Sequence, residues 1–225
     1  MNGPTPRERA RAETLAQIKH LALNQLAAAG AGELSLRAIA RELNLVSSAI
    51  YRYYTSRDEL ITALLIDAYA DLADQLEAVS APGRRAARRR WADAADTLRT
   101  WARAEPHRFA LIYGTPIPGY HAPADTVAPA GRVIRALAEP LTGGNPAAGG
   151  AQPRPGRALR GQLEVTAAAL ELDVAPSTMR LIVNAIAGLI GLVTLELGGH
   201  FVGGFEPADD LYAAYLDDVA GSLSL

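Results

Sequence analysis

Apolar residues recur every three to four positions along most of the chain, which is the period of an α-helix with one buried face. No segment shows the strict alternation of apolar and polar residues that is typical of a half-buried strand. Segments rich in glycine and proline interrupt the pattern and mark helix ends. The spacing predicts helices at 14–29, 36–43, 47–54, 58–79, 84–104, 106–113, 125–141, 159–172, 177–199 and 207–221. The chain is therefore predicted to be all-α, with about ten helices.

Residues 35–60 carry the most specific local pattern. A short helix with one apolar face follows Ser35, whose hydroxyl can cap the helix N-terminus. Asn44 comes directly after this helix, and asparagine tolerates the left-handed conformation that ends a helix. A second short helix then opens at Ser47. Two short helices joined by a tight turn predict a helix-turn-helix, in which the second helix enters the major groove of DNA.

A capping box, Ser56-x-x-Glu59, directly before an apolar run predicts the start of the next helix. With this feature, the segment resembles the DNA-binding domain of the TetR family of transcriptional regulators. The residues that carry the resemblance are Ile39-Ala40, Tyr51-x-Tyr53-Tyr54 and Ser56-Arg57-x-Glu59-Leu60. The chain departs from the family pattern at Asn44, where Gly is usual, and at Val46, where a capping Ser is usual. We therefore expect the cap of the second helix to shift to Ser47.

The layout of the motif predicts which residues contact DNA. Four residues at the front of the second helix are expected to face base edges: Ser47, Ser48, Ala49 and Arg52. Arg52 could donate two hydrogen bonds to guanine O6 and N7, worth roughly 1–3 kcal/mol of discrimination. Phosphate contacts are predicted at Ser35, Arg37, Tyr51, Tyr53 and Arg57. The alternatives are a surface arginine, serines that only cap helices, and tyrosine rings that only pack in the core.

The charge distribution supports a nucleic-acid partner, although the net charge of −2 alone does not. Residues 1–57 hold eight Lys and Arg against four Asp and Glu, whereas the rest of the chain holds 14 against 20. A basic N-terminal part joined to an acidic remainder is expected of a DNA-binding domain with a regulatory partner domain. The five arginines within residues 84–90 lie outside the motif and are predicted to form a solvated helix face.

The C-terminal part resembles the same family more loosely, through Glu105-Pro106-x-x-Phe109-x-Leu111-Ile112 and Leu195-Glu196-Leu197-Gly198-Gly199-His200. By this resemblance it is a ligand-binding domain, and several aromatic residues near the Pro- and Gly-rich break at 114–123 point to a pocket. We predict an apolar or aromatic small-molecule effector in contact with Trp101, Phe109, Tyr113, Tyr120, His121 and His200. The alternative is that these residues are ordinary core or loop residues. No histidine pair has metal-ligand spacing, so neither a metal nor a cofactor is predicted.

Small residues within the apolar helix 177–199 would let another helix approach closely. Together with the helix 159–172, this predicts a four-helix homodimer interface at Leu163, Ala167, Leu170, Ala185, Gly188 and Leu192. The longest apolar run, 181–197, is short for a membrane span and contains polar residues, so a buried helix is predicted. The predicted domains are 1–60, which binds DNA, and 61–225, which binds the ligand and dimerises.

These features predict a cytoplasmic, homodimeric repressor that leaves a palindromic or pseudo-palindromic DNA operator when its effector binds. The helix 58–79 belongs to both predicted domains and is the expected lever between them. A helical protein that binds DNA or another partner without a small ligand stays open, and a closed apolar cavity would discriminate against it. An enzyme is not predicted, because the chain lacks nucleotide-binding, serine-hydrolase and paired-histidine motifs.

Overall fold

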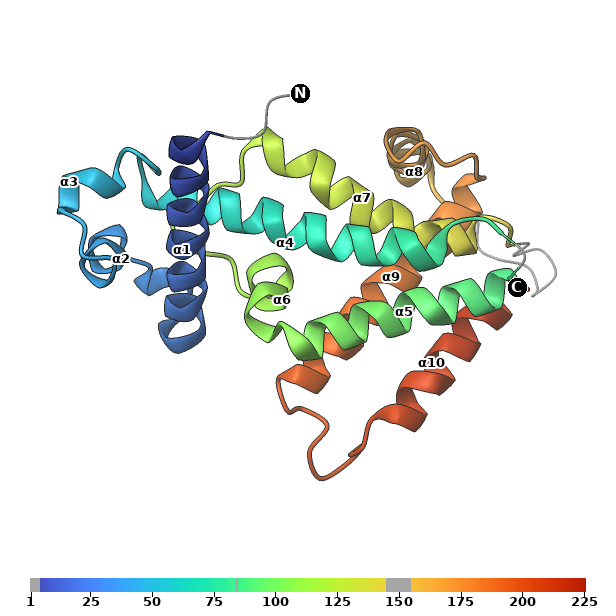
Figure 1. The fold of residues 1–225 in the computed structure, drawn as a ribbon. Helices are drawn as coiled ribbons and strands as arrows, with labels where there is room; N and C mark the ends of the chain where they lie inside the picture. Colours follow the sequence, from blue (N-terminus) through green and yellow to red (C-terminus); the bar gives the residue numbers. More distant parts are fainter. Residues whose placement is uncertain (1–4, 84, 145–154) are drawn as a thin grey trace. The chain divides into compact units, whose positions relative to one another are not determined.

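The computed structural model describes residues 5–83, 85–144 and 155–225 of the 225-residue chain. Within these ranges there are ten α-helices, three short 3-10 helices and no strand, which confirms the all-α prediction (Figure 1). The chain divides into two compact units, the first formed by residues 1–68 and 107–126, and the second by 69–106 and 127–225.

The first unit is built around the helix-turn-helix. Its helices are α1 (Pro6–Ala29), η1 (Ala31–Glu33), α2 (Leu36–Glu42), α3 (Ser47–Ile50), the first half of α4 (Arg57–Ser80), α6 (Pro106–Tyr113) and η2 (Ala124–Thr126). Apolar side chains from α1 to α4 form its core, and the fully buried ones include Ile18, Ile39, Ile50, Leu60 and Ile61. The three-helix DNA-binding fold predicted from the sequence is thus present.

Helix α1 begins at Pro6, not at Thr14 as the apolar spacing indicated. The first two turns carry few apolar residues, so the periodicity could not report them. A capping box starts the helix instead: the backbone N–H of Glu8 donates to the Thr5 hydroxyl at 3.2 Å, and the Glu8 carboxylate accepts from the Thr5 N–H at 2.7 Å. The bonds that the Glu8 carboxylate accepts from the N–H and hydroxyl of Thr5 hold its pKa below the usual value.

Two predicted caps are also revised. The N-cap of α3 is Val46, which makes no side-chain capping bond, and Ser47 is the first residue inside the helix. At α4, the Glu59 N–H donates to the Ser56 hydroxyl at 3.1 Å as predicted. The Glu59 carboxylate, however, accepts from the N–H of Thr55 at 2.6 Å. The hydrogen bonds from Thr55 hold the pKa of Glu59 below its usual value.

The second unit contains the remaining helices: the second half of α4, α5 (Ala87–Ala104), α7 (Val127–Ala138), η3 (Glu139–Leu141), α8 (Arg157–Ala169), α9 (Pro176–Leu197) and α10 (Asp209–Ser222). Helix α5 packs against α7, α9 and α10, while α9 packs against α5, α7, α8 and α10. Large buried side chains such as Trp91, Leu98, Leu137 and Met179 fill the space between them.

Helix α9 is long and apolar enough to cross a membrane by length and composition alone. Its Ile182, Leu189 and Val193 are nonetheless fully buried within the chain, and four other helices contact it. We therefore interpret α9 as a core helix, as predicted from the polar residues within its apolar run.

The two units part inside α4, between Ala68 and Tyr69, and residues 107–126 group with the N-terminal helices. The sequence-based division at residue 60 assigned this segment to the second domain. That division, into 1–60 and 61–225, stays a prediction.

Candidate nucleic-acid interface and regulatory sites

The turn between α2 and α3 has the conformation that the sequence indicated. Ser35 caps α2, since its hydroxyl accepts from the Ala38 N–H at 3.3 Å. Asn44 adopts a left-handed backbone with φ of 54°. The N–H of the next residue, Leu45, then donates to the Ala40 carbonyl at 2.8 Å. These contacts hold α3 at a defined angle to α2, as a helix-turn-helix requires.

The N-terminal turn of α3 is open to solvent. Ser47 and Ser48 are exposed, and the Val46 side chain before them is 73% exposed. Ala49 is half-buried, and Ile50, which anchors the helix, is fully buried. The predicted base-reading serines are thus free to meet a partner, while the back of the helix belongs to the core.

The residues after α3 present aromatic and basic groups. Tyr51 is 40% exposed, and Arg52 is exposed in the turn that follows the helix. Tyr53 is half-buried, and the guanidinium carbon of Arg11, from α1, lies 5.1 Å from the centre of its ring. This distance is typical of a cation–π contact, which fixes Arg11 beside the end of α3.

The two other predicted phosphate-binding arginines differ in their surroundings. Arg37 is exposed on α2. Arg57 is half-buried: its guanidinium donates to the Gly32 carbonyl at 3.4 Å and lies 3.6 Å from the Asp58 carboxylate. Arg57 therefore has structural contacts within its own unit besides any phosphate that it binds.

A basic cleft between α1 and the end of α3 was missed by the sequence reasoning. Its volume is about 310 Å³, and Arg7 and Arg11 line it from α1, opposite Arg52 and Tyr53. The charge count of residues 1–57 includes Arg7 and Arg11 but does not single them out. Their spacing of four residues places them on one helix face, and this was the signal available in the sequence.

The six predicted effector-binding residues do not form one site in the described structure. Phe109, Tyr113, Tyr120 and His121 belong to the first unit, whereas Trp101 and His200 belong to the second. The rings of Phe109 and Tyr113 are in contact, with their centres 5.3 Å apart.

The other four have separate surroundings. The hydroxyl of Tyr120 bonds that of Thr62 on α4 at 2.8 Å. The indole N–H of the buried Trp101 donates to the Asp71 carboxylate at 2.9 Å. His121 and His200 are both exposed. Their common role in effector binding stays a prediction.

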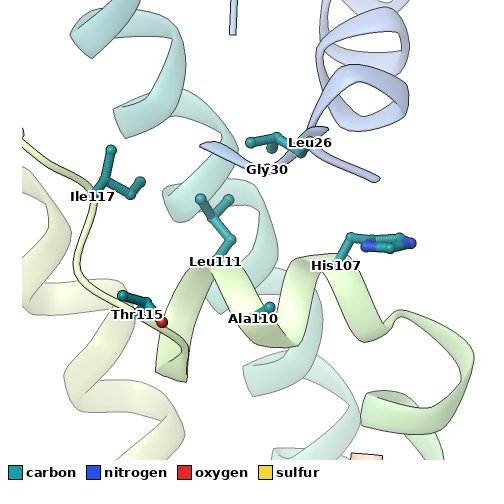
Figure 2. Close-up of a pocket in the computed structure, with 7 residues that line it drawn as sticks. All are labelled: Leu26, Gly30, His107, Ala110, Leu111, Thr115 and Ile117. Atoms are coloured by element: carbon teal, nitrogen blue, oxygen red, sulfur yellow. The ribbon is translucent and has the colours of Figure 1, made fainter. Parts of the chain in front are cut away.

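A different cavity lies between the C-terminal end of α1 and α6. Figure 2 shows Leu26 and Gly30 from the α1 end facing His107, Ala110 and Leu111 of α6, with Thr115 and Ile117 closing one side. Its volume is about 220 Å³, below the range of roughly 300–1,000 Å³ that is usual for ligand sites. None of the predicted effector residues lines it.

The predicted interface residues on α8 and α9 are mostly covered by their own chain. Leu163, Ala167 and Ala185 are buried, while Leu170 and Leu192 are half-buried.

Gly188 has an intramolecular reason to be small, because a Cβ there would lie 2.5 Å from the Tyr215 hydroxyl of α10. That hydroxyl donates to the Ala185 carbonyl. The assignment of these residues to a dimer interface stays a prediction.

The same two helices carry an exposed stripe in which most residues are small or apolar. Val165 on α8 is 71% exposed, and Val183 on α9 is 43% exposed. The stripe continues through exposed positions on the same helix faces: Gln162 and Ala169 on α8, three and four residues from Val165, and Ala187 and Thr194 on α9, four and eleven residues from Val183. We call these six residues the α8–α9 stripe.

The basic cluster within residues 84–90 pairs largely with acidic residues of its own unit. Arg85 and Arg89 contact the Asp93 carboxylate at 2.8 and 3.0 Å, and Arg88 contacts Asp217 at 2.7 Å. Arg90 donates to the Ser80 carbonyl at 2.8 Å. The first arginine of the cluster, Arg84, lies outside the described residues.

Two family models match the chain. One, described as bacterial regulatory proteins of the tetR family, matches residues 18–64. The other, described as the C-terminal domain of tetracyclin repressor-like proteins, matches residues 91–219. The two matched segments contain, respectively, the helix-turn-helix and most of the second unit.

Individual relatives agree with these matches. The HTH-type transcriptional regulators Rv1816 of Mycobacterium tuberculosis and Mb1846 of Mycobacterium bovis are each 47% identical over 143 residues. The match spans 61% of this chain but only 60% of the length of these curated relatives.

Solved structures extend the likeness to nearly the whole chain. A crystal structure described as that of a regulatory protein, SCO4313, has a TM-score of 0.79 and 38% identity, and covers 96% of this chain and 100% of that one. A protein of unknown function from Rhodococcus sp. RHA1 shares the fold, with a TM-score of 0.69, 24% identity, and coverage of 94% and 96%.

Proposed function

The chain belongs to the TetR family of bacterial regulatory proteins, and we propose that it is a cytoplasmic, homodimeric repressor that a small apolar molecule releases from its operator. The observation that carries the DNA-binding part is the exposed N-terminal turn of α3, together with the exposed Arg37 of α2. A helix in this position can enter the major groove while the cations beside it bind the phosphates.

We propose that sequence is read at the front of α3. The hydroxyl groups of Ser47 and Ser48 can donate to or accept from base edges, and the methyl group of Ala49 can contact a thymine methyl. The hydroxyl of the exposed Tyr51 and the guanidinium of Arg37 are suited to phosphate oxygens. Ser35 positions α2 through its cap, so its hydroxyl hydrogen remains available to a phosphate.

For the dimer, we propose that the α8–α9 stripe forms the contact. A partner at this face would cover the exposed Val165 and Val183 together, and small neighbours such as Ala187 let two helices approach closely. A two-fold axis through this face would generate a four-helix interface between copies. Two recognition helices could then read half-sites one DNA turn apart, roughly 34–36 Å.

The effector is proposed to act by shifting a two-state equilibrium. Helix α4 supports this, because it runs from the helix-turn-helix unit into the second unit without interruption. The Tyr120–Thr62 bond ties the segment after α6 to α4, so a ligand near Tyr113 or Tyr120 would bear on this helix. An effector that prefers one position of α4 changes DNA affinity by its difference in affinity between the two states.

Selection from random-sequence DNA tests the proposal. The purified chain should enrich a palindromic or pseudo-palindromic site, and Ser48→Ala should alter the preference at particular positions of that site. A control substitution of similar size at Thr100, an exposed residue of α5, to Ala, should leave the preference unchanged. Failure of the wild-type protein to enrich any sequence would contradict the DNA-binding function.

The dimer is tested by charge placed in the stripe. Val165→Glu should convert the protein to a monomer in light scattering, because burying an unpaired carboxylate costs several kcal/mol. Val127, which is 68% exposed on α7, provides the matched control, since Val127→Glu adds the same charge outside the stripe. A stable dimer in the Val165 variant would place the interface elsewhere.

The effector part is tested by a thermal-shift screen of small apolar compounds, followed by DNA release. Both tryptophans of the chain lie on α5, so their fluorescence reports a ligand that contacts Trp101 or that changes the packing of the second unit. Compounds that stabilise the protein and also release DNA would support the proposal. Stabilising compounds that leave DNA affinity unchanged would favour a DNA-binding protein without an effector.

A further inference from the structure

The basic cleft between α1 and the end of α3 has the composition of an anion site. Arg7 and Arg11 line it from α1 and Arg52 from the turn after α3, and no carboxylate is among the lining residues. Small residues, Ala10 and Ala49, also line it. Three arginines therefore line an opening of about 310 Å³, and no acidic residue lines it with them.

Neighbouring groups keep the cleft cationic. The carboxylate of Glu8, between the two arginines in sequence, is engaged by the N–H and hydroxyl of Thr5 at 2.7 and 2.9 Å. Arg11 is held against the ring of Tyr53 at 5.1 Å. A guanidinium that is already positioned loses less conformational freedom when it binds an anion, which favours binding.

The position of Arg52 differs from that expected of a base-reading residue. Helix α3 ends at Ile50, and Arg52 follows it in the turn, where it shares the cleft with residues of α1. Base edges are approached by the N-terminal residues of the recognition helix, whereas groups at its far end meet the phosphate backbone. This placement favours a phosphate contact for Arg52 over the predicted guanine contact.

We propose that the cleft binds one phosphodiester group of the DNA backbone and that Arg7, Arg11 and Arg52 together form this phosphate clamp. The proposal rests on the proposed DNA-binding function and adds two contacts from α1, outside the helix-turn-helix. It also transfers Arg52 from base reading to phosphate binding. Arginine suits this role, because its planar fork offers two parallel hydrogen bonds to phosphate oxygens.

The experiment compares two DNA probes by fluorescence anisotropy at several salt concentrations. One is the duplex recovered by selection from random DNA, and the other is a 30-base-pair duplex of arbitrary mixed sequence, a length of about three helical turns. Arg7→Ala, Arg11→Ala and Arg52→Ala should each weaken binding by about tenfold, and by the same factor on both probes, because a phosphate carries no sequence information.

The salt dependence tests whether the three arginines share one phosphate. Each phosphate contact contributes about 0.9 to the magnitude of the slope of log affinity against log salt concentration. A dimer has two clamps, so removing both should reduce the magnitude of this slope by about 1.8. The triple variant should show this loss and no more. A loss about three times larger would mean three separate phosphates and would overturn the shared clamp.

Arg9 provides the matched control. It is an exposed arginine of the same helix turn, but it does not line the cleft. Arg9→Ala removes the same charge and should change affinity much less than Arg7→Ala. Circular dichroism verifies that α1 stays helical in each variant.

Several outcomes would overturn the clamp. Equal losses of DNA affinity for Arg9→Ala and Arg7→Ala would mean that the effect comes from overall positive charge and not from the cleft. A loss for Arg52→Ala on the selected duplex alone would restore its base-reading role. Unchanged affinity in the Arg7 and Arg11 variants, with a wild type that binds DNA, would reject the α1 contacts while leaving the proposed function intact. A wild type that binds neither probe would instead reject the proposed function.

Discussion

Arg99 is expected to be the most important ionic residue of the second unit. Its side chain on α5 is only 9% exposed. Its Nε and Nη2 donate to the two carboxylate oxygens of Glu196 at 2.9 and 2.6 Å, and its Nη1 donates to Asp209 at 2.8 Å. Its guanidinium carbon also lies 4.3 Å from the centre of the Tyr212 ring. One side chain thus links α5 to the end of α9 and the start of α10.

The perturbation that tests this is Arg99→Met, which keeps an apolar stem but removes the charge and all three hydrogen bonds. Removing one partner of a buried ion pair costs about 3–5 kcal/mol, because the other charge is left uncompensated. The Glu196 side chain is 16% exposed and keeps a bond from Arg103 at 2.5 Å, so the lower end of the range applies. We expect a loss of about 3 kcal/mol, which for a chain of this size lowers Tm by about 6–12 °C.

Urea unfolding followed by tryptophan fluorescence is the appropriate assay. Both tryptophans, Trp91 and Trp101, are buried on α5, so the signal reports the unit that contains Arg99. Arg103→Met is the matched control: it lies one turn further along α5 and bonds the same Glu196, but its side chain is 50% exposed. Exposed ion pairs contribute about 0–1 kcal/mol, so the control should lose much less.

A double variant sharpens the test. Adding Glu196→Gln to Arg99→Met removes the charge that was left uncompensated and should restore much of the lost stability, because the penalty arises from that charge. The reasoning is refuted if Arg99→Met costs no more than Arg103→Met. It is also refuted if the double variant is as unstable as the sum of its single substitutions.

Three further predictions concern the turn, a close helix contact and pH. Asn44→Ala should lower the free energy of unfolding by about 1 kcal/mol, measured by urea unfolding followed by circular dichroism, because φ is 54° at this residue. Asn44→Gly should lower it little, since glycine adopts this conformation readily. Equal effects of the two substitutions would contradict this reasoning. Gly188→Ala should lower the free energy of unfolding by about 1–3 kcal/mol, because the added Cβ would displace the Tyr215 ring. Adding Tyr215→Ala should relieve this clash. If Gly188→Ala alone leaves the stability unchanged, the ring moves aside without cost. The bonds from Arg99 hold the pKa of the Glu196 carboxyl below its usual value, so the stability that Glu196 contributes is full above the pKa of the unfolded chain and is lost as pH falls through the lowered folded pKa. In Glu196→Gln, the free energy of unfolding should no longer fall with pH across this range. An unchanged pH profile in that variant would exclude Glu196 as the source of the dependence.

Local patterns predicted the helix-turn-helix because its determinants are local. The Ser35 cap and the left-handed Asn44 each depend on neighbours within a few residues, so sequence spacing reports them directly. The buried face of α2 follows from helical periodicity alone. Where local signals competed, the prediction was wrong in detail: Ser47 offers a capping hydroxyl, yet Val46 occupies the cap position.

The first two turns of α1 show the limit of the hydrophobic pattern. They are exposed and carry arginines, so nothing in the apolar spacing marks them as helical. The Thr5–Glu8 capping box was present in the sequence but lay outside the periodic stretch. A search for caps ahead of each periodic segment would have found it.

The amino-acid sequence by itself determined the all-α class, the helix-turn-helix and the residues at the front of α3, because each follows from contacts between near neighbours in the chain. The tertiary structure alone decided three other features. It set Arg7 and Arg11 opposite Arg52, joined Arg99 to Glu196 and Asp209, and placed Gly188 against Tyr215. These contacts join residues far apart in sequence, and which helix faces meet depends on the packing of all the buried side chains together. Helical periodicity identifies a face that will be buried, but it carries no information about which other helix will cover it.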